Sequence, residues 1–170
     1  MSLEIRDIMV QKVITVEMTA SLKETVDLMN RHGIGCVVVC ENQRPVGVLT
    51  ERDLLQRVLA NTPGLPQIGV QQVMSAPVWT GKPDMDLEQA VGLMVERGIK
   101  KLPITDDEKL VGLATLTDIL RFQPQLIRAY KILSSDVVPP RMKKVFDYYT
   151  LLYPRSKSSS MKGMLLRPPK

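Results

Sequence analysis

The chain has 170 residues, the length of one domain, and its 44% hydrophobic and 24% charged residues are typical of a globular protein. No apolar run reaches the roughly 18 residues of a membrane span. Glu4 and Asp7 stand where a secretion signal needs basic and then apolar residues, so we expect neither feature. The net charge of +5 divides into −4 for residues 1–120 and +9 for residues 121–170, which predicts an acidic body with a basic C-terminal extension.

An internal duplication organises the acidic body. When the sequence is shifted by 65 positions, residues 9–55 align without a gap with residues 74–120, and 14 of the 47 aligned positions are identical. Two copies are too few to stack as a solenoid, which needs at least three repeats. We therefore expect the two copies to pack against each other. The identical pairs include Met9/Met74, Gly33/Gly98, Gly47/Gly112, Thr50/Thr115 and Asp53/Asp118.

The first copy predicts the element order β-α-β-β-α. Ser21 and Glu24 have the spacing of a capping box that opens a helix, and Gly33 suits the left-handed conformation that ends one. The run CVVV, the polar turn ENQR and the run VGVL together predict a hairpin. In chain order, we expect a strand at 13–16, a helix after Ser21, strands at 36–39 and 46–49, and a helix from Thr50.

The second copy predicts the same order after a linker that contains proline and glycine. Its expected elements are a strand at 78–80, a helix between Asp86 and Gly98, strands at 102–104 and 111–114, and a helix from Thr115. The fold class is therefore mixed α/β (α+β), with two similar repeats. The expected divisions are the first repeat at 1–60, the linker at 61–67, the second repeat at 68–122 and the basic extension at 123–170.

The cysteines and the histidine indicate neither a disulfide nor a metal site. If 36–39 is a strand, the Cα atoms of Cys36 and Cys40 lie about 13 Å apart, whereas a disulfide needs less than about 7 Å. A reduced, cytoplasmic compartment is the expectation that fits. His32 is the only histidine, and without a cysteine cluster it does not support a zinc site. No catalytic motif stands out, so we expect no enzymatic activity.

Three motifs recur in both copies in the same order. They are DIM (7–9) and QVM (72–74), RHGIGCVVV (31–39) and ERGIKKLPI (96–104), and GVLTERD (47–53) and GLATLTD (112–118). In this combination the sequence resembles a tandem pair of CBS domains, named after cystathionine β-synthase, over about residues 3–121. The resemblance implies a non-catalytic regulatory module whose repeats pack through their sheets about a pseudo-twofold axis. It also implies a homodimer, because family members usually stack two such pairs.

The resemblance further implies two clefts that bind adenosyl ligands, such as AMP, ADP, ATP or S-adenosylmethionine. The motif Thr-x-x-Asp at Thr50 and Asp53 then has two interpretations. It is a capping box at a helix start, and by resemblance it contacts the ribose and the adjacent phosphate. A carboxylate can accept two hydrogen bonds from a ribose diol, and the amides of a helix start suit an anion. Both interpretations can hold, since one aspartate has several lone pairs.

By resemblance, each cleft combines residues of both repeats. Lys100 and Lys101 would give the first cleft the charge for several phosphates, unless they are ordinary solvated lysines. The second cleft, with Gly35 and Cys36 at the matching positions, would suit a neutral or weakly charged adenosyl group. The first cleft would hold Thr50, Arg52, Asp53, Val73, Ile99, Lys100 and Lys101, and the second Thr115, Thr117, Asp118, Ile8, Ile34, Gly35 and Cys36.

The basic extension has no counterpart after the first repeat. Residues 125–133 and 141–153 have helical patterns, and the second pattern has an apolar face. One interpretation is that these helices cap the repeats or a dimer interface. The other is that the extension docks to an acidic protein partner, nucleic acid or an anionic membrane. The alternative to a ligand sensor is therefore an interaction protein with empty clefts, which binds an unknown protein partner or nucleic acid through this extension.

Overall fold

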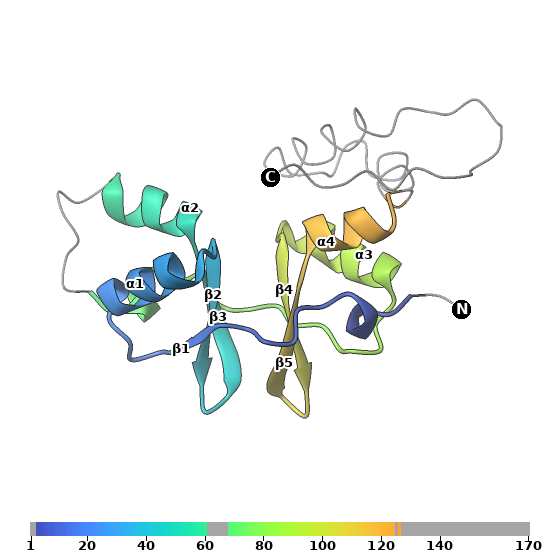
Figure 1. Ribbon diagram of the computed structural model, residues 1–170, viewed down its shortest axis with the longest axis horizontal. Coiled ribbons are helices and arrows are strands. Elements are labelled where there is room, and N and C mark those ends of the chain that lie inside the picture. Colours follow the sequence, from blue (N-terminus) through green and yellow to red (C-terminus); the bar gives the residue numbers. More distant parts are fainter. Residues whose placement is uncertain (1–2, 61–67, 125, 127–170) are drawn as a thin grey trace.

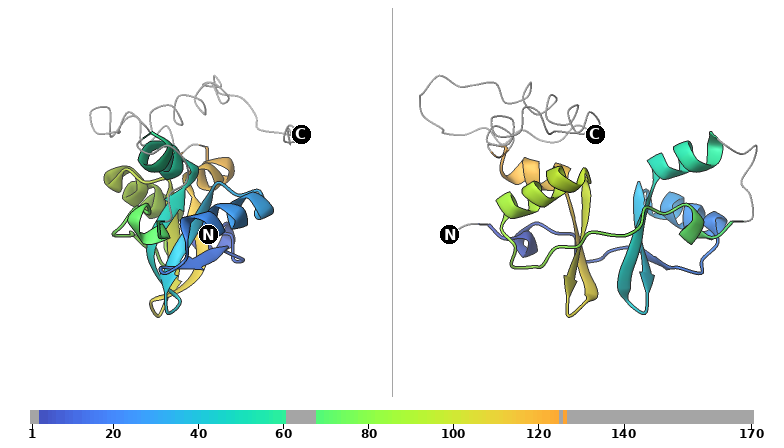
Figure 2. Two further views of the ribbon diagram at one scale, coloured as in Figure 1. Left: turned by 90° about the vertical axis from the view of Figure 1, so that its left-hand side faces the viewer. Right: turned by 180° about the vertical axis from the view of Figure 1, so that it is seen from behind.

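The structure, a computed structural model, describes residues 3–60, 68–124 and 126; the linker expected at 61–67 and the helical pattern at 141–153 lie outside them, as does 125–133 except for Leu126. Two α+β repeats lie side by side, with their sheets facing each other in the middle and their helices on the outer sides (Figure 1; Figure 2, right). The mixed fold class and the duplication are confirmed. No helix of the described part of the chain is long and apolar enough to cross a bilayer.

The first repeat follows the predicted order. Its elements are β1 (Thr15–Glu17), α1 (Leu22–His32), β2 (Cys36–Glu41), β3 (Arg44–Thr50), the short helix α2 (Glu51–Asp53) and a π-helix that continues α2 (Leu54–Leu59). β1 runs parallel to β2, and β2 pairs antiparallel with β3. The predicted capping box is present, since Glu24 N donates to Ser21 Oγ at 3.2 Å and Ser21 N donates to Glu24 Oε2 at 3.1 Å. Gly33 ends α1 with a φ of 60°.

The second repeat lacks the strand that we expect at 78–80. It consists of α3 (Leu87–Arg97), β4 (Lys101–Asp106), β5 (Lys109–Thr115) and α4 (Leu116–Phe122), and β4 and β5 form a two-stranded sheet. Only an isolated bridge between Gly81 and Ile104 stands where β1 pairs with β2 in the first repeat. The prediction of a strand at 78–80 is therefore wrong.

Two prolines explain the missing strand. In the first repeat, Val38 N donates to Ile14 O at 3.3 Å and Met18 N donates to Cys40 O at 2.9 Å, which holds the two ends of β1. The matching positions in the second repeat are Pro103 and Pro83. Proline has no N–H to donate, so both of these bonds are lost and the bridge at Gly81 cannot grow into a strand.

The segments that precede the two repeats are exchanged between them. Residues 3–10, with the 3₁₀ turn η1 (Ile5–Asp7), pack on the second repeat, where Ile5 N donates to Met85 O at 2.8 Å. Residues 68–75, with the turn η3 (Val70–Gln72), pack on the first repeat, where Val70 N donates to Ala20 O at 2.9 Å. Ile5 and Val70 are fully buried in the cores of the repeats that receive them. Figure 1 accordingly shows the turn η1, in dark blue, on the same side of the molecule as α3 and α4.

This exchange explains the repeated pairs of glycine and methionine. A β-carbon on Gly47 would overlap Met74 Sδ, and one on Gly112 would overlap Met9 Sδ, so each methionine of an exchanged segment lies against the strand glycine of the other repeat. A side chain added at either glycine would therefore force the methionine to move.

Replacing Gly112 by alanine is expected to lower the free energy of unfolding by about 1–3 kcal/mol, because the added methyl group displaces Met9 in a packed site. Urea denaturation measures the change. Gly69→Ala is the matched control, since the nearest atom to its added methyl group lies 3.7 Å away, at ordinary contact distance. Equal stability of the two variants would contradict the proposed close approach.

The two sheets meet through a small apolar cluster. Val38, Cys40 and Leu113 are buried there, with Cys36 partly buried beside them. The two cysteines are unpaired, as predicted. Burial, and to a smaller extent the charge of Glu17, raise the pKa of the Cys40 thiol to about 11, so it stays protonated and unreactive at neutral pH.

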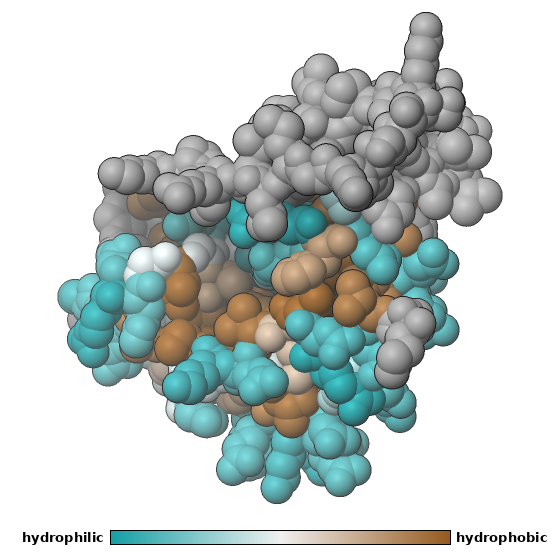
Figure 3. Space-filling view, turned by 45° about the vertical axis from the view of Figure 1, so that its right-hand side comes forward, coloured by the Kyte–Doolittle hydropathy of each residue, from teal (hydrophilic) through white to brown (hydrophobic). Residues whose placement is uncertain are grey.

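The surface seen from the side of the second repeat carries both apolar and hydrophilic residues (Figure 3). Figure 3 shows apolar residues near the middle of this face, among hydrophilic residues. Several large apolar side chains are exposed on the second helix of each repeat: Leu55 and Leu59 in the first and Phe122 in the second, each more than half exposed.

Candidate functional site

A cavity of about 460 Å³ lies where β3 ends and β4 begins, so both repeats contribute to its wall. Thr50, Asp53 and Ser75 supply hydroxyl and carboxylate groups. An apolar part of the wall is formed by Val48, Pro77, Val78, Trp79 and Ile99, and a charged part by Glu51, Arg52, Arg57, Lys100 and Lys101. The cavity thus offers apolar, hydrogen-bonding and charged surfaces, the combination that small-molecule sites use.

Most residues predicted for the first cleft line this cavity. They are Thr50, Arg52, Asp53, Ile99, Lys100 and Lys101. Val73 does not line it: its side chain is buried in the core of the first repeat, and its carbonyl accepts a hydrogen bond from Arg57. Gly35, predicted for the second cleft, lines this cavity instead, with its carbonyl accepting from Glu51 N at 3.1 Å.

The other residues predicted for the second cleft lie apart from this cavity. Thr115 and Asp118 cap α4, and Thr117 is exposed on its first turn. Ile8 packs on the core of the second repeat, Ile34 on the core of the first, and Cys36 on the cluster between the sheets. Their assignment to a ligand site stays a prediction.

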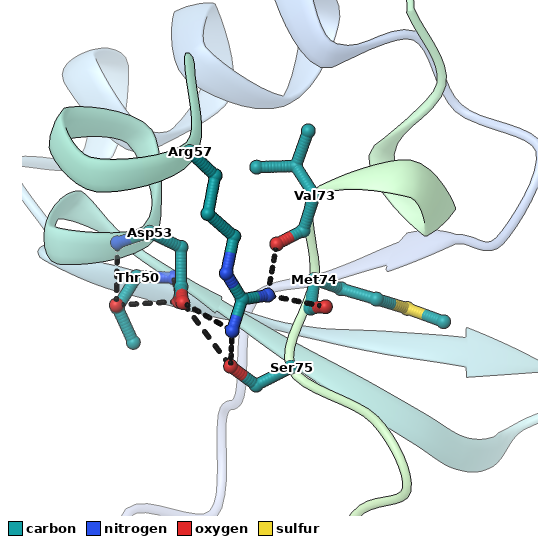
Figure 4. Close-up of polar contacts among 6 residues, drawn as sticks. All are labelled: Thr50, Asp53, Arg57, Val73, Met74 and Ser75. Atoms are coloured by element: carbon teal, nitrogen blue, oxygen red, sulfur yellow. Dashed lines mark hydrogen bonds and ion pairs between the residues drawn. The ribbon is translucent and has the colours of Figure 1, made fainter. Parts of the chain in front are cut away.

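Thr50 and Asp53 form the capping box that their spacing predicts. Asp53 N donates to Thr50 Oγ1 at 3.3 Å, while Asp53 Oδ2 accepts from Thr50 N at 2.9 Å and from Thr50 Oγ1 at 2.6 Å. The other carboxylate oxygen, Oδ1, accepts from Ser75 Oγ at 3.1 Å and lies 3.4 Å from Arg57 Nη2 (Figure 4). The carboxylate is therefore nearly buried and surrounded by donors.

The matching pair in the second repeat has fewer partners. Thr115 Oγ1 donates to Asp118 Oδ2 at 2.5 Å, and Asp118 N donates to Thr115 Oγ1 at 3.2 Å. Arg121 Nη1 lies 3.8 Å from Asp118 Oδ1. The side chain of Asp118 is 29% exposed, against 12% for Asp53. The difference has a sequence cause, since Phe122 and Val10 stand where the first repeat has Arg57 and Ser75.

The charges at the cavity favour an anionic ligand. Arg52, Arg57, Lys100 and Lys101 line it, against the carboxylates of Glu51 and Asp53. Within the part of the chain that the structure describes, Arg52 and Lys101 make no hydrogen bond or ion pair through their side chains. Cations held in a concave wall concentrate an anionic ligand. Among the described residues, no group of three or more His, Cys, Asp and Glu is placed to hold a metal ion.

Sequence reasoning missed several residues of the cavity wall, among them Trp79, Arg57 and Ser75. Trp79 is 41% exposed, and the Arg97 guanidinium carbon lies 4.0 Å from its ring centroid, a stacked cation–π arrangement. Arg57 and Ser75 meet at Asp53 (Figure 4). Arg57 could have been found from its spacing, because a residue four positions after Asp53 faces it on a helix. Ser75 carries no such signal.

Two α+β repeats, which face each other and exchange their leading segments around a shared cavity, define a tandem-repeat module. The family model of the CBS domain matches residues 5–60 and 70–124, and the chain belongs to this family. An uncharacterised protein of Methanopyrus kandleri is 39% identical over 128 residues, which cover 74% of this chain and 65% of that protein. The match thus spans less than two thirds of that relative.

Solved structures share the fold. A conserved protein of Pyrococcus horikoshii is 31% identical, with a TM-score of 0.63 over 72% of this chain and 92% of that one. A CBS domain pair solved with 5′-methylthioadenosine and S-adenosyl-L-methionine is 23% identical, with a TM-score of 0.65 over 74% and 98% of the two chains. CBSX2, solved in complex with AMP, is 24% identical, with a TM-score of 0.58 over 72% and 97%. The last two show a likeness of fold alone.

Proposed function

We propose that this protein is a non-catalytic regulatory module that binds an adenosyl ligand (AMP, ADP, ATP, S-adenosylmethionine or a related compound) and signals by a change of conformation or assembly. The observation that carries the proposal is the cavity between the repeats, where an apolar wall, the carboxylate of Asp53 and the cations Arg52 and Lys101 meet. The complexes of two proteins of the same fold with AMP and with S-adenosyl-L-methionine support it. A cytoplasmic location fits such a ligand.

Each part of the wall suits one part of the ligand. The apolar surfaces of Val78, Trp79 and Ile99 would contact the adenine ring, which gains from burial against flat and branched side chains. Asp53 would accept from the ribose hydroxyls. Arg52 and Lys101, whose side chains have no partner among the described residues, would meet the phosphates with charge-assisted hydrogen bonds.

The cavity is expected to bind AMP about tenfold more tightly than adenosine at low ionic strength, and added salt should reduce the difference. Isothermal calorimetry measures both affinities. The fluorescence of Trp79, the only tryptophan of the chain, reports binding at the cavity wall directly. Replacing both Arg52 and Lys101 by alanine should remove the preference for AMP.

Lys109→Ala is the matched control for the loss of a positive charge, because Lys109 is exposed at the start of β5, and it does not line the cavity. It should keep the preference for AMP. Equal affinity of the unchanged protein for adenosine and AMP at low salt would contradict the role of the cations. An unchanged fluorescence and no heat with any adenosyl compound would contradict the proposed function itself.

A homodimer would provide the change of assembly. Leu55 and Leu59, four residues apart on one helix and each more than half exposed, support this part of the proposal as apolar side chains available for contact with a second copy. Sedimentation with and without ligand measures the assembly state. The binding of a protein partner or nucleic acid by the basic extension stays a prediction from charge alone, because nearly all of that extension lies outside the described residues.

A further inference from the structure

Arg57 fastens the exchanged segment of the second repeat to the first. From the π-helix Leu54–Leu59, its Nη1 donates to the carbonyls of Val73 and Met74, each at 2.7 Å. Its Nη2 donates to Ser75 Oγ at 3.1 Å (Figure 4). One planar guanidinium thus holds three successive residues, a geometry that a lysine could not reproduce.

The same guanidinium also pairs with the carboxylate of Asp53. A carboxylate offers about four lone-pair positions on its two oxygens. Oδ2 accepts two hydrogen bonds from Thr50, and Oδ1 interacts with Ser75 Oγ at 3.1 Å and with Arg57 Nη2 at 3.4 Å. Three hydrogen bonds therefore already use this carboxylate, and its remaining free side faces the Arg57 guanidinium at 3.4 Å.

A ribose diol needs acceptor positions on this carboxylate, so it must displace donors that are already there. The contacts of Thr50 are the shortest, at 2.6 and 2.9 Å, and they close a helix cap. The contacts of Arg57 and Ser75 are longer and lie on the other oxygen. The ribose would therefore replace Arg57 and Ser75, and not Thr50.

Displacing the donors of Asp53 would also affect the sheet, because Ser75 is bonded both to Asp53 and to β3. Ser75 N donates to Val48 O at 2.8 Å, and Val48 N donates to Ser75 O at 3.1 Å, so Ser75 is paired with β3. The second repeat has the same pairing between Val10 and Leu113, but Val10 has no hydroxyl and Phe122 replaces the arginine. A ribose at Asp118 would therefore displace no donor that also holds the exchanged segment.

We propose that Arg57 is a positioning residue that competes with ribose for Asp53, and that it thereby couples occupancy of the cavity to the attachment of residues 73–75. The proposal rests on the proposed binding of an adenosyl ligand, and it names the way in which that site would signal. It assigns the response to the first repeat alone, because the second repeat lacks both the arginine and the serine.

The test compares Arg57→Met with Arg121→Met, which removes the arginine beside Asp118. Without ligand, Arg57→Met should raise the hydrogen exchange rates of the Val48 and Ser75 amides at least tenfold, and should leave those of Val10 and Leu113 unchanged. It should also raise the affinity for adenosine by about three- to tenfold, because a competing donor is gone. Arg121→Met should change neither the exchange of Val48 and Ser75 nor the affinity at the cavity.

Ser75→Ala is the second variant, because it removes one donor to Asp53 and leaves the bonds of Arg57 to the carbonyls of Val73 and Met74. It too should bind adenosine more tightly. In the unchanged protein, saturating adenosine should speed exchange at Val48 and Ser75, and in Arg57→Met it should have no further effect. This dependence on the ligand is a result that a merely structural arginine would not produce.

Weaker adenosine binding by both variants, or slower exchange at Val48 and Ser75 on adding adenosine, would overturn the competition. Failure of the unchanged protein to bind any adenosyl compound would overturn both the proposed function and the coupling. In that case the exchange rates of Val48 and Ser75 without ligand still test whether Arg57 holds residues 73–75. Equal rates in Arg57→Met and in the unchanged protein would show that it does not.

Discussion

Replacing Ile5 by alanine is expected to lower the free energy of unfolding by about 2–5 kcal/mol, and to do so by weakening the second repeat. Ile5 precedes the first repeat in the chain, but its side chain is fully buried among Leu87, Val91 and the other core residues of the second. Truncation leaves a cavity there and removes apolar contacts. Urea denaturation, followed by Trp79 fluorescence and by circular dichroism, measures the loss.

The matched control is Leu3→Ala, since Leu3 is an exposed apolar residue of the same segment and should change stability little. Hydrogen exchange locates the effect: in Ile5→Ala the amides of α3 should lose protection before those of α1. The converse holds for Val70→Ala, which removes the matching side chain from the core of the first repeat. Loss of protection in α1 alone for Ile5→Ala would contradict the exchange of segments.

Replacing Asp53 by alanine is expected to weaken the binding of adenosine and AMP to the cavity by about ten- to a hundredfold, since a hydrogen bond to a charged acceptor is worth about 1.5–3 kcal/mol. Asp53 lies in the cavity wall, hydrogen-bonded to Thr50 and Ser75. Calorimetry measures the loss. Asp118→Ala should leave this site intact and weaken any second adenosyl site by a similar factor.

Asp53 closes the capping box of α2, and Asp118 is hydrogen-bonded to Thr115, the residue that caps α4, so an effect on the helix start must be separated from the loss of a ligand contact. Glu24→Ala is the matched control, because Glu24 closes the capping box of α1 with Ser21 and does not line the cavity. It should leave the affinity unchanged. Unchanged affinity in folded Asp53→Ala and Asp118→Ala would reduce Thr-x-x-Asp to a plain helix cap.

The exchange of segments bears on how a signal could travel. Residues 68–75 leave the linker, complete the core of the first repeat and then line the cavity through Ser75 before the chain enters the second repeat. A change at Asp53 therefore acts on a segment that belongs to both repeats. The segment at residues 3–10 has the same place in the second repeat, but without the polar link to the aspartate.

Local patterns were enough to predict most of the elements. Ser21 and Glu24 opened α1 and Gly33 ended it because capping and left-handed glycine depend on residues within one turn. The constant offset of 65 showed that the chain is a pair of similar repeats. The absence of a strand at 78–80 is explained by Pro83 and Pro103. The sequence did not reveal this, because only the pairing of β1 with β2 shows which N–H groups the hydrogen-bond ladder needs.

The amino-acid sequence alone was enough to predict the duplication, the helix caps, the unpaired cysteines and, through the resemblance, six residues of the cavity wall. Only the tertiary structure showed that Ile5 and Val70 enter the core of the opposite repeat, that Gly35 lines the same cavity as Lys101, and that Arg57 and Ser75 meet at Asp53. The physical reason is the separation in sequence of the residues that make each contact. A cap or a strand pattern is set by neighbours in the chain, whereas these contacts join residues that are far apart in sequence and are chosen by which surfaces bury together.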